Sequence, residues 1–454
     1  MQKLRAQIRS IATSSILRNT GWQYASNIAG ALLAFVYSLM LGRALGVEKY
    51  GLISLSLGFA GLIFNLVELR LHEWVIRYLT EFWEAGDYRR AIATIRLSLI
   101  ADVVTGLIAV VSVFALSPIA AVLFNELRTE RAQTLIWLAG MVSFSGNVGN
   151  ATAIGVLRVL KSFRALALIK IGGHLLKLAA TAIVLLLVNI GVSRAVLGVS
   201  VATGLVTTIV LAAVAVRELR RSLPFKVKNS RISLLQPRLP EMARFAGNIY
   251  GVSLAAIPTR DLDVNFLGVY SSAAVVGTYR VARDFMAAMW QVSDPMLFVI
   301  YPELSRLWAR RDLQALQRLL WSSFFGLAAV AVLLCGAAFF TVPSIITMSM
   351  GSDFAEAGLY FRWMLIGLVV WMPLLWVNPL LMASGRADLF FRATVVASVA
   401  TLACDVYLIP KWGGTGASFA YAVSHIAAPL TSLWLARANG IFRQLRGCDH
   451  SSLH

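Results

Sequence analysis

The sequence is short of charged residues, of cysteine and of catalytic motifs. Only 14% of its residues are Asp, Glu, Lys or Arg, whereas soluble domains contain about 25%. The three cysteines are far apart, which excludes a disulfide framework and a metal-ligand spacing. The chain has no phosphate-binding loop of the G-x-x-x-x-G-K-S/T type, no zinc motif and no nucleophile elbow. We therefore expect a protein that is not an enzyme, has no cofactor or metal, and does not drive transport with ATP by itself.

Long apolar runs are abundant instead. Hydrophobic residues make up 58% of the chain, and runs of about 20 residues recur along its whole length. These runs do not alternate in polarity, so helices rather than a barrel must satisfy the backbone in a bilayer. We predict an all-α polytopic membrane protein with 12 transmembrane spans. The expected spans are 20–42, 52–76, 93–117, 133–156, 165–189, 195–216, 244–268, 273–300, 320–348, 357–382, 388–409 and 413–436.

The positive charges predict the orientation. The net charge of +19 would suggest nucleic acid as the partner of a soluble chain, but here Lys and Arg gather in alternate loops. With the N-terminus inside, 28 of the 41 lie on the cytoplasmic side and 6 on the other side. The positive-inside rule then places both termini in the cytoplasm. We expect an uncleaved, multi-pass protein of the cytoplasmic (inner) membrane that binds no nucleic acid.

The longest loop divides the spans six and six. We predict an N-terminal six-helix lobe at 1–216, a basic cytoplasmic linker at 217–243, a C-terminal six-helix lobe at 244–437 and a cytoplasmic tail at 438–454. The positive-inside rule alone explains a basic linker. Contact with anionic lipid headgroups would be a further use of the same residues.

Three segments recur after about 225 residues, which indicates a duplication. Residues 45–55 match 271–281 with Gly51 opposite Gly277, residues 81–95 match 306–320 with Asp87 opposite Asp312, and residues 188–198 match 410–420. Six spans in each half keep the two repeats parallel. We predict two pseudo-symmetric lobes around a central cavity, the usual frame for alternating access.

Charged residues inside the spans are the candidate functional residues, because each costs about 2.5–3.5 kcal/mol to insert and so tends to face a cavity or a partner. The stretch 257–285 carries most of them: Arg260, Asp261, Asp263, Arg280, Arg283 and Asp284. Pro258 is expected to break or kink this helix. Arg280 and Asp284 are spaced to pair on one helix. The alternative to a functional site is a charge network that locks the seventh and eighth spans together.

Further charges lie in the other lobe. Arg70 is deep in the second span, where a local pair with Glu68 or Glu73 is the alternative. Lys170, His174 and Lys177 share one face of the fifth span. Snorkelling to the inner surface explains Lys170 but not Lys177, so we favour a cavity role for Lys177. The isolated acids Asp102, Asp294 and Asp405 could each bind a coupling ion or cap a neighbouring helix.

Five segments, spread over nearly the whole chain, carry a resemblance to a known family: LGRALGVEKYGLISLSLGF, RYLTEFWEAGDYRRA, DLDVNFLGVYSSAAVVGTYRVA, YPELSRLWARRDLQAL and GRADLFFRATVVASVATLACDVYLIPKWGGTGASFAYAVS. With these segments the sequence resembles the O-antigen and exopolysaccharide flippases of the multidrug/oligosaccharidyl-lipid/polysaccharide superfamily. The family often has Asn where this chain has Asp405, which leaves the role of that position open. The resemblance implies two six-helix lobes around a cationic cavity.

The function that it implies is movement of a polyprenyl-diphosphate-linked oligosaccharide to the outer leaflet, for lipopolysaccharide or exopolysaccharide biosynthesis. The partners would be this lipid-linked oligosaccharide, membrane lipids and a glycan polymerase or export machinery. Fixed cations would replace the hydration of the diphosphate; our candidates are Arg70, Lys177, Arg260, Arg280 and Arg283. H⁺ or Na⁺ coupling would enter through acids; our candidates are Asp261, Asp263, Asp284 and Asp102.

Two other functions compete with this interpretation. A multidrug-type, cation-coupled exporter of small molecules would be expected to have a more acidic or aromatic cavity than this basic chain offers. A membrane-embedded glycan polymerase or ligase would need a sizeable outer loop, and the predicted outer loops are all short. The sequence does not decide between H⁺ and Na⁺ or between one glycan and another.

Overall fold

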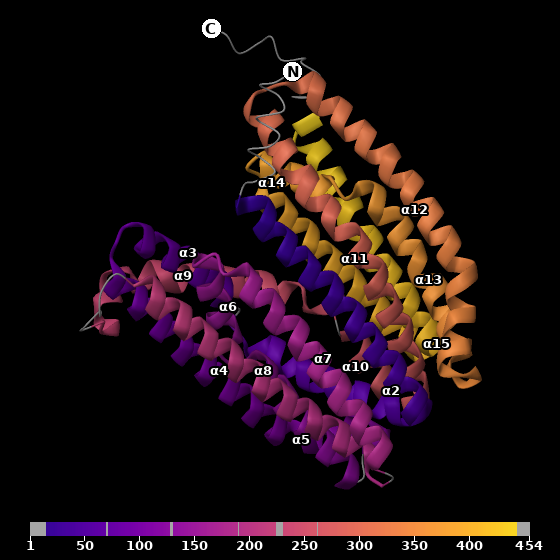
Figure 1. Cartoon of the computed structure of the whole chain (residues 1–454). Coiled ribbons are helices and arrows are strands. Elements are labelled where there is room, and N and C mark those ends of the chain that lie inside the picture. Colours follow the sequence, from indigo (N-terminus) through magenta and orange to yellow (C-terminus); the bar gives the residue numbers. More distant parts are fainter. Residues whose placement is uncertain are drawn as a thin grey trace. The chain divides into compact units, whose positions relative to one another are not determined.

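The computed structural model describes residues 15–69, 71–127, 130–188, 190–223, 230–260 and 262–442. These residues form α-helices and short 3-10 helices, with no strand among them (Figure 1). In chain order the elements are α2 (Ser15–Val67), α3 (Leu71–Glu84), α4 (Tyr88–Leu123), η1 (Asn125–Leu127), α5 (Glu130–Asn147), α6 (Asn150–Val159), α7 (Phe163–Leu187), α8 (Val192–Ser222), η2 (Ile232–Arg238), α9 (Leu239–Ala255), η3 (Ile257–Thr259), α10 (Leu262–Tyr270), α11 (Ala273–Ala309), α12 (Leu313–Met350), η4 (Ser352–Phe354), α13 (Ala355–Trp371), η5 (Met372–Leu374), α14 (Val377–Ala383) and α15 (Ala387–Ala438).

Seven stretches of the described residues are long and apolar enough to cross a membrane. They are Gly21–Val67, Tyr88–Leu123, Phe163–Leu187, Val192–Ser222, Leu313–Met350, Ser352–Ala383 and Ala387–Ala438. The prediction of an all-α polytopic membrane protein is confirmed. The two longest stretches, Gly21–Val67 and Ala387–Ala438, each consist of two helices that meet at a kink. The second contains the predicted spans 388–409 and 413–436, whereas the predicted span 52–76 is divided between α2 and α3.

The chain forms two compact units. The first unit contains residues 1–37, 59–122 and 127–254, and the second contains 38–58, 123–126 and 255–454. α2 is therefore shared, with its first part in one unit and residues 38–58 in the other. Likewise α9, which opens the predicted seventh span, belongs to the first unit.

Each unit is a bundle of helices. In the first, α8 packs against α5, α6 and α7, and α3 packs on α6. In the second, α13 lies between α12 and α15 and also contacts α11, while α10 and α14 pack on α15 (Figure 1).

Helix breaks occur where glycine or proline makes them possible. α2 is kinked at Gly46 (φ 75°, ψ 169°), and α15 at Gly413 (φ 51°, ψ −127°), backbone angles that favour glycine. Pro258 lies in η3, which separates α9 from α10. The predicted break at Pro258 is confirmed, because proline cannot donate to the preceding turn of a helix.

The turns of the two units repeat the duplication seen in the sequence. Gly86 and Arg311, about 225 residues apart, have left-handed backbones with φ of 74° and 54°. Lys161 and Gly385 form a second such pair, with φ of 57° and 76°. At all four turns two backbone N–H groups bond back to helix carbonyls, the Schellman arrangement.

The helices after the first pair of turns begin alike. The Asp87 carboxylate accepts from the Arg90 N–H at 3.1 Å, and the Asp312 carboxylate from the Ala315 N–H at 3.0 Å. The buried cores beneath these turns also correspond, since Leu79, Phe82 and Ala91 in the first unit match Leu304, Leu307 and Leu316 in the second. The predicted correspondence of Asp87 and Asp312 is confirmed, because each residue is the N-cap of the equivalent helix in its own unit.

The matched glycines Gly51 and Gly277 lie in direct contact. A Cβ on Gly51 would come within 1.7 Å of the Ala273 carbonyl oxygen, and one on Gly277 within 2.4 Å of the Val47 carbonyl oxygen. α2 and α11 therefore cross with their backbones touching, which only glycine allows. Equivalent residues of the two repeats meet at this crossing.

Candidate functional site

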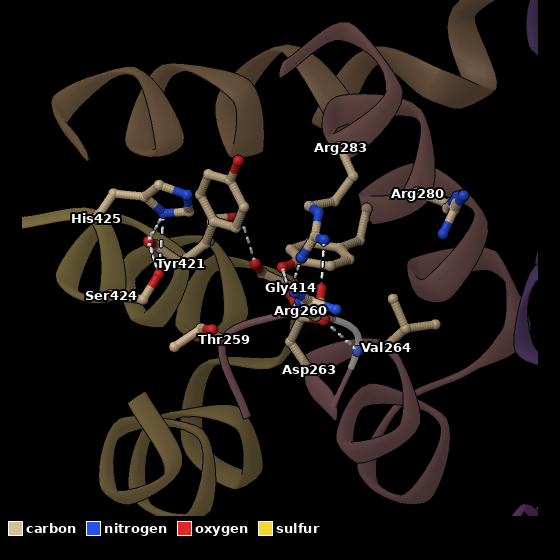
Figure 2. A network of polar contacts seen from close by, with 12 residues as sticks. Thr259, Arg260, Asp263, Val264, Arg280, Arg283, Gly414, Tyr421, Ser424 and His425 are labelled. Atoms are coloured by element: carbon tan, nitrogen blue, oxygen red, sulfur yellow. Dashed lines mark hydrogen bonds and ion pairs between the residues drawn. The ribbon is translucent and has the colours of Figure 1, made fainter. Parts of the chain in front are cut away.

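The centre of the second unit is an ion pair between α10 and α11. Arg283 donates from Nη1 to the Asp263 carboxylate and from Nη2 to the Arg260 backbone carbonyl at 2.5 Å (Figure 2). Tyr279 donates its hydroxyl to the same carboxylate, whose other oxygen caps the Val264 N–H at 2.8 Å. The Asp263 and Arg283 side chains are 7% and 16% exposed. Contacts of this kind are what the alternative to a functional site, a charge network that locks the seventh and eighth spans together, would also make.

Aromatic residues of α15 and α11 surround the Arg283 guanidinium. It lies over the Tyr421 ring, 4.8 Å from its centroid. The Tyr421 hydroxyl accepts from the Trp290 indole N–H at 2.7 Å, and the Trp290 ring packs against His425. His425 Nδ1 is held by the Tyr421 carbonyl at 2.8 Å and the Ser424 hydroxyl at 2.9 Å (Figure 2). The Arg283 guanidinium is therefore held by the Asp263 carboxylate, the Arg260 carbonyl and the Tyr421 ring.

Asp405 of α15 adds an acid to this network. Its side chain is fully buried (0% exposed), and neither carboxylate oxygen has a hydrogen-bond partner among the described residues. It interacts electrostatically with both Asp263 and Arg283. Arg283 forms its ion pair with Asp263, and Asp405 is a second buried carboxylate whose charge interacts with that pair. Burying an ionised carboxylate without a partner is so costly that it stays protonated or holds a cation.

Asp284 and Arg280 form a second, separate cluster. Arg280 Nε lies 3.2 Å from one Asp284 oxygen, which confirms the predicted i, i+4 pair. The other Asp284 oxygen accepts from the hydroxyls of Ser38 and, at 2.8 Å, Tyr50. Arg280 stands apart from the Arg283 network (Figure 2). Asp284 therefore joins the later part of α2 to α11, and both of its carboxylate oxygens have partners.

The first unit holds a cationic face on α7. The Lys177 ammonium lies 4.4 Å from the centroid of the Tyr37 ring, whose hydroxyl bonds to Ser200 at 3.3 Å. The His174 ring lies against Gly30 of α2, and Lys170 is partly buried on the same face. Within the described part of the chain no carboxylate forms an ion pair with any of these three groups. The two lysines make this face positively charged, and among the described residues no carboxylate pairs with them.

Asp102 is a structural acid. It accepts from the Thr152 N–H at 3.2 Å and the Thr152 hydroxyl at 2.6 Å, and Ser98 bonds to the same threonine at 2.7 Å. These bonds join α4 to α6 inside the first unit. The helix-capping alternative considered for this residue matches its contacts.

The structure places the predicted site residues in several clusters. Arg283 and Asp263 are brought together, Arg280 and Asp284 form another pair, and Arg260 contributes its carbonyl to Arg283. Arg70 and Asp261 lie outside the described residues. Asp405 was noted as an isolated acid but not chosen as a coupling candidate. The feature of the sequence that could have identified Asp405 is its position as a single carboxylate within the apolar run 388–409.

The model of the family described as "Polysaccharide biosynthesis protein" matches residues 16–308. The chain is 22% identical over 414 residues to the "Probable low-salt glycan biosynthesis flippase Agl15" of Haloferax volcanii, which covers 88% of this chain and 79% of that protein. It is 24% identical over 157 residues to "Inner membrane protein YghQ" of Escherichia coli, covering 34% of this chain and 43% of that one. This second match spans less than half of the relative's length.

Solved structures share the fold. The lipid II flippase MurJ in an inward closed conformation superposes with a TM-score of 0.67 at 13% identity, over 93% of this chain and 89% of that one. A multidrug resistance MATE family transporter in an inward-facing conformation gives 0.65 at 13% identity, over 94% and 96%. At this identity the likeness shows the fold alone. The family match covers more than half of the chain, and the chain therefore belongs to the polysaccharide biosynthesis protein family.

Proposed function

We propose that this protein is a flippase that moves a polyprenyl-diphosphate-linked oligosaccharide from the cytoplasmic to the outer leaflet, for lipopolysaccharide or exopolysaccharide biosynthesis. The observation that carries the proposal is the cationic face of α7, at Lys170 and Lys177, with His174 between them. Family membership supports it, as does the similarity to a protein named as a glycan biosynthesis flippase. The flipped product would pass to a glycan polymerase or export machinery, and both termini would be cytoplasmic.

A diphosphate cannot enter hydrocarbon without counter-charges. Lys177 offers a point charge on α7, and the Tyr37 ring beneath it holds that charge without neutralising it. A carboxylate partner would have to be displaced before phosphate could bind, and in the described residues the α7 face has none. Arg280 and Arg283, by contrast, already bond to Asp284 and Asp263. We therefore assign diphosphate binding to Lys177, with Lys170 as the cation nearer the entry side.

We assign ion coupling to the pair Asp405 and Asp263 around Arg283. When Asp405 takes up H⁺ or Na⁺, Arg283 is left to neutralise Asp263 alone. When the ion leaves, one guanidinium must serve two carboxylates, which weakens its hold on Asp263 and on the Arg260 carbonyl. Both α10 and α15 supply an acid, so release of the ion would change how these two helices are held. Uptake and release of the ion would thereby drive alternating access.

The test is flipping by the purified full-length protein in proteoliposomes, with a polyprenyl-diphosphate oligosaccharide as substrate. Lys177→Gln is expected to slow flipping about tenfold to a hundredfold, the size of a lost charged hydrogen bond, and Lys177→Arg to retain most of it. The matched control is Lys411→Gln, since Lys411 also lies over a tyrosine ring, 3.7 Å from the centroid of Tyr407. Equal rates for Lys177→Gln and the control would overturn the assignment.

The coupling ion is tested in the same vesicles. Imposed H⁺ and Na⁺ gradients are compared for the wild type and for Asp405→Asn. We expect one gradient to accelerate flipping in the wild type and neither to do so in the variant. Export of organic cations without any flipping would instead place the protein with the multidrug exporters, whose fold it shares.

A further inference from the structure

An apolar slot lies in the first unit, between α3, α4 and α9. Its volume is about 140 Å³, and its walls include Leu71, Trp74, Leu97, Ala101, Met242 and Ala246. The Trp74 indole N–H is satisfied by the Met242 carbonyl at 3.3 Å, and the Ser98 hydroxyl by Thr152, so the walls offer a ligand no polar group. An apolar cavity of about 150 Å³ stays dry and binds a molecule of about six carbons. The slot therefore fits one stretch of a single hydrocarbon chain.

The slot lies at the depth of the predicted inner membrane surface. Its residues are within a turn or two of positions 76, 93 and 244, where the sequence predicts the cytoplasmic ends of three spans. The polar boundary of the bilayer, where lipid phosphates lie, is expected at this level.

Arginines surround the same ends of these helices. The Arg77 guanidinium lies 4.3 Å from the centroid of the Phe245 ring, one residue from the slot wall at Ala246. Arg96, next to Leu97 of the wall, donates to the Ser230 carbonyl at 2.8 Å and keeps its charge unpaired by any described carboxylate. Arg244 is exposed on α9, beside the wall residue Ala243.

The acids at this rim are occupied by another arginine. Arg238 of the linker bonds to Glu81 and, at 3.1 Å, to Glu241. Arg238 donates these hydrogen bonds to Glu81 and Glu241, and they raise the pKa of Arg238 above its ordinary value, with the bond to Glu81 having the larger effect. The Arg77 guanidinium lies 3.7 Å from the Glu241 carboxylate, a longer and weaker ion pair than the one between Arg238 and Glu241. The rim therefore keeps a positive excess above an apolar slot.

We propose that this slot is a binding site for an anionic phospholipid of the inner leaflet, with one acyl chain between α3, α4 and α9 and its phosphate on Arg77, Arg96 and Arg244. Neither the family nor the proposed transport function assigns a lipid to this place. Apolar walls beneath a basic rim match the two ends of such a lipid, and each surface arginine adds about 1 kcal/mol of attraction to an anionic headgroup.

A resident phospholipid fits the slot better than the polyprenyl tail of a transported substrate. The linker packs directly on this region, since Leu235 of η2 is buried in the same core as Trp74 and Met242. The rim lies on elements of a single unit that are predicted to be cytoplasmic. A substrate bound there would not be carried toward the outer leaflet. A lipid that stays bound would instead fasten the linker and α9 to α3 and α4.

The experiment is native mass spectrometry of the delipidated full-length protein with added dioleoyl phosphatidylglycerol, dioleoyl phosphatidylcholine or a polyprenyl phosphate. We expect phosphatidylglycerol to bind most tightly. Filling the slot from either side, with Ala246→Leu or Ala101→Leu, should weaken its binding at least tenfold. Arg244→Gln should weaken it about fivefold, the worth of one surface charge.

The matched controls lie on the second unit. Ala337→Leu changes an exposed alanine of α12, and Arg318→Gln an exposed arginine of the same helix; neither should alter binding. Using two slot-filling variants from different helices separates loss of the site from a folding defect in one of them. Equal binding by all variants, equal binding of phosphatidylcholine, or preferential binding of the polyprenyl phosphate would each overturn the proposal.

Discussion

Replacing Arg283 by Ala should destabilise the protein before it affects any substrate. The sequence alone predicts that this change abolishes export and leaves expression intact, because Arg283 is there a candidate for diphosphate binding. In the structure Arg283 bonds to Asp263, to the Arg260 carbonyl and to the Tyr421 ring. Its removal leaves a carboxylate that is 7% exposed without its cation.

The expected cost is large. Breaking a buried ion pair from one side costs about 3–5 kcal/mol, since the remaining charge is uncompensated. The Tyr279 hydroxyl still donates to Asp263, but it carries no charge to offset the carboxylate. We therefore expect the free energy of unfolding to fall by about this amount.

The assay is a thermodynamic double-mutant cycle on the protein in detergent. The unfolding midpoints of Arg283→Ala, Asp263→Asn and the double variant are compared with that of the wild type. The double variant should recover much of the loss, because it leaves no buried charge at this pair, and the amide oxygen introduced by Asp263→Asn still accepts from Tyr279. If Arg283→Ala kept the wild-type midpoint while flipping stopped, the reasoning would be refuted and Arg283 would belong to the substrate site.

Three further predictions follow from particular contacts. Gly51→Val should prevent folding, because its Cβ would overlap the Ala273 carbonyl, whereas Gly61→Val, with no atom within 4 Å of its Cβ, should leave a monodisperse peak in size-exclusion chromatography. Asp312→Ala should lower the free energy of unfolding by about 1 kcal/mol through loss of an N-cap, and Asp312→Asn should not. Asp284→Asn should raise hydrogen exchange in α2 near Ser38, because two hydroxyl donors lose a charged acceptor there; unchanged exchange would show that the cluster does not hold α2.

Much of the fold could be predicted because it depends on local information. Long apolar runs specify membrane helices whatever their neighbours are, and the recurrence after about 225 residues indicates that both halves have the same turns. Pro258 marks the break between α9 and α10 by its own chemistry. The predicted separation of the first two spans corresponds to the kink of α2 at Gly46, where the backbone leaves the helical conformation.

The candidate site was predicted less completely, and the reason is sequence separation. Arg280 and Asp284 are one helical turn apart, so their pairing could be predicted. Arg283 and Asp263 lie on different helices, and their pairing depends on how α10 packs against α11. The importance of Asp405 depends on burial and on the absence of a partner among the described residues, and neither property is local.

Under the proposed function, the distribution of charge assigns substrate binding to one unit and ion coupling to the other. In the second unit Arg280 and Arg283 are each joined to an acid, and the Asp405 carboxylate is buried without a hydrogen-bond partner among the described residues. Such a network is sensitive to a small cation and offers little to a diphosphate. In the first unit Lys177 of α7 faces the Tyr37 ring and has no acid among the described residues, an arrangement that attracts an anion. Neutralising Lys177 should therefore weaken substrate binding with ion dependence intact, and neutralising Asp405 should remove ion dependence with substrate binding intact. A single variant that abolished both together would contradict this separation.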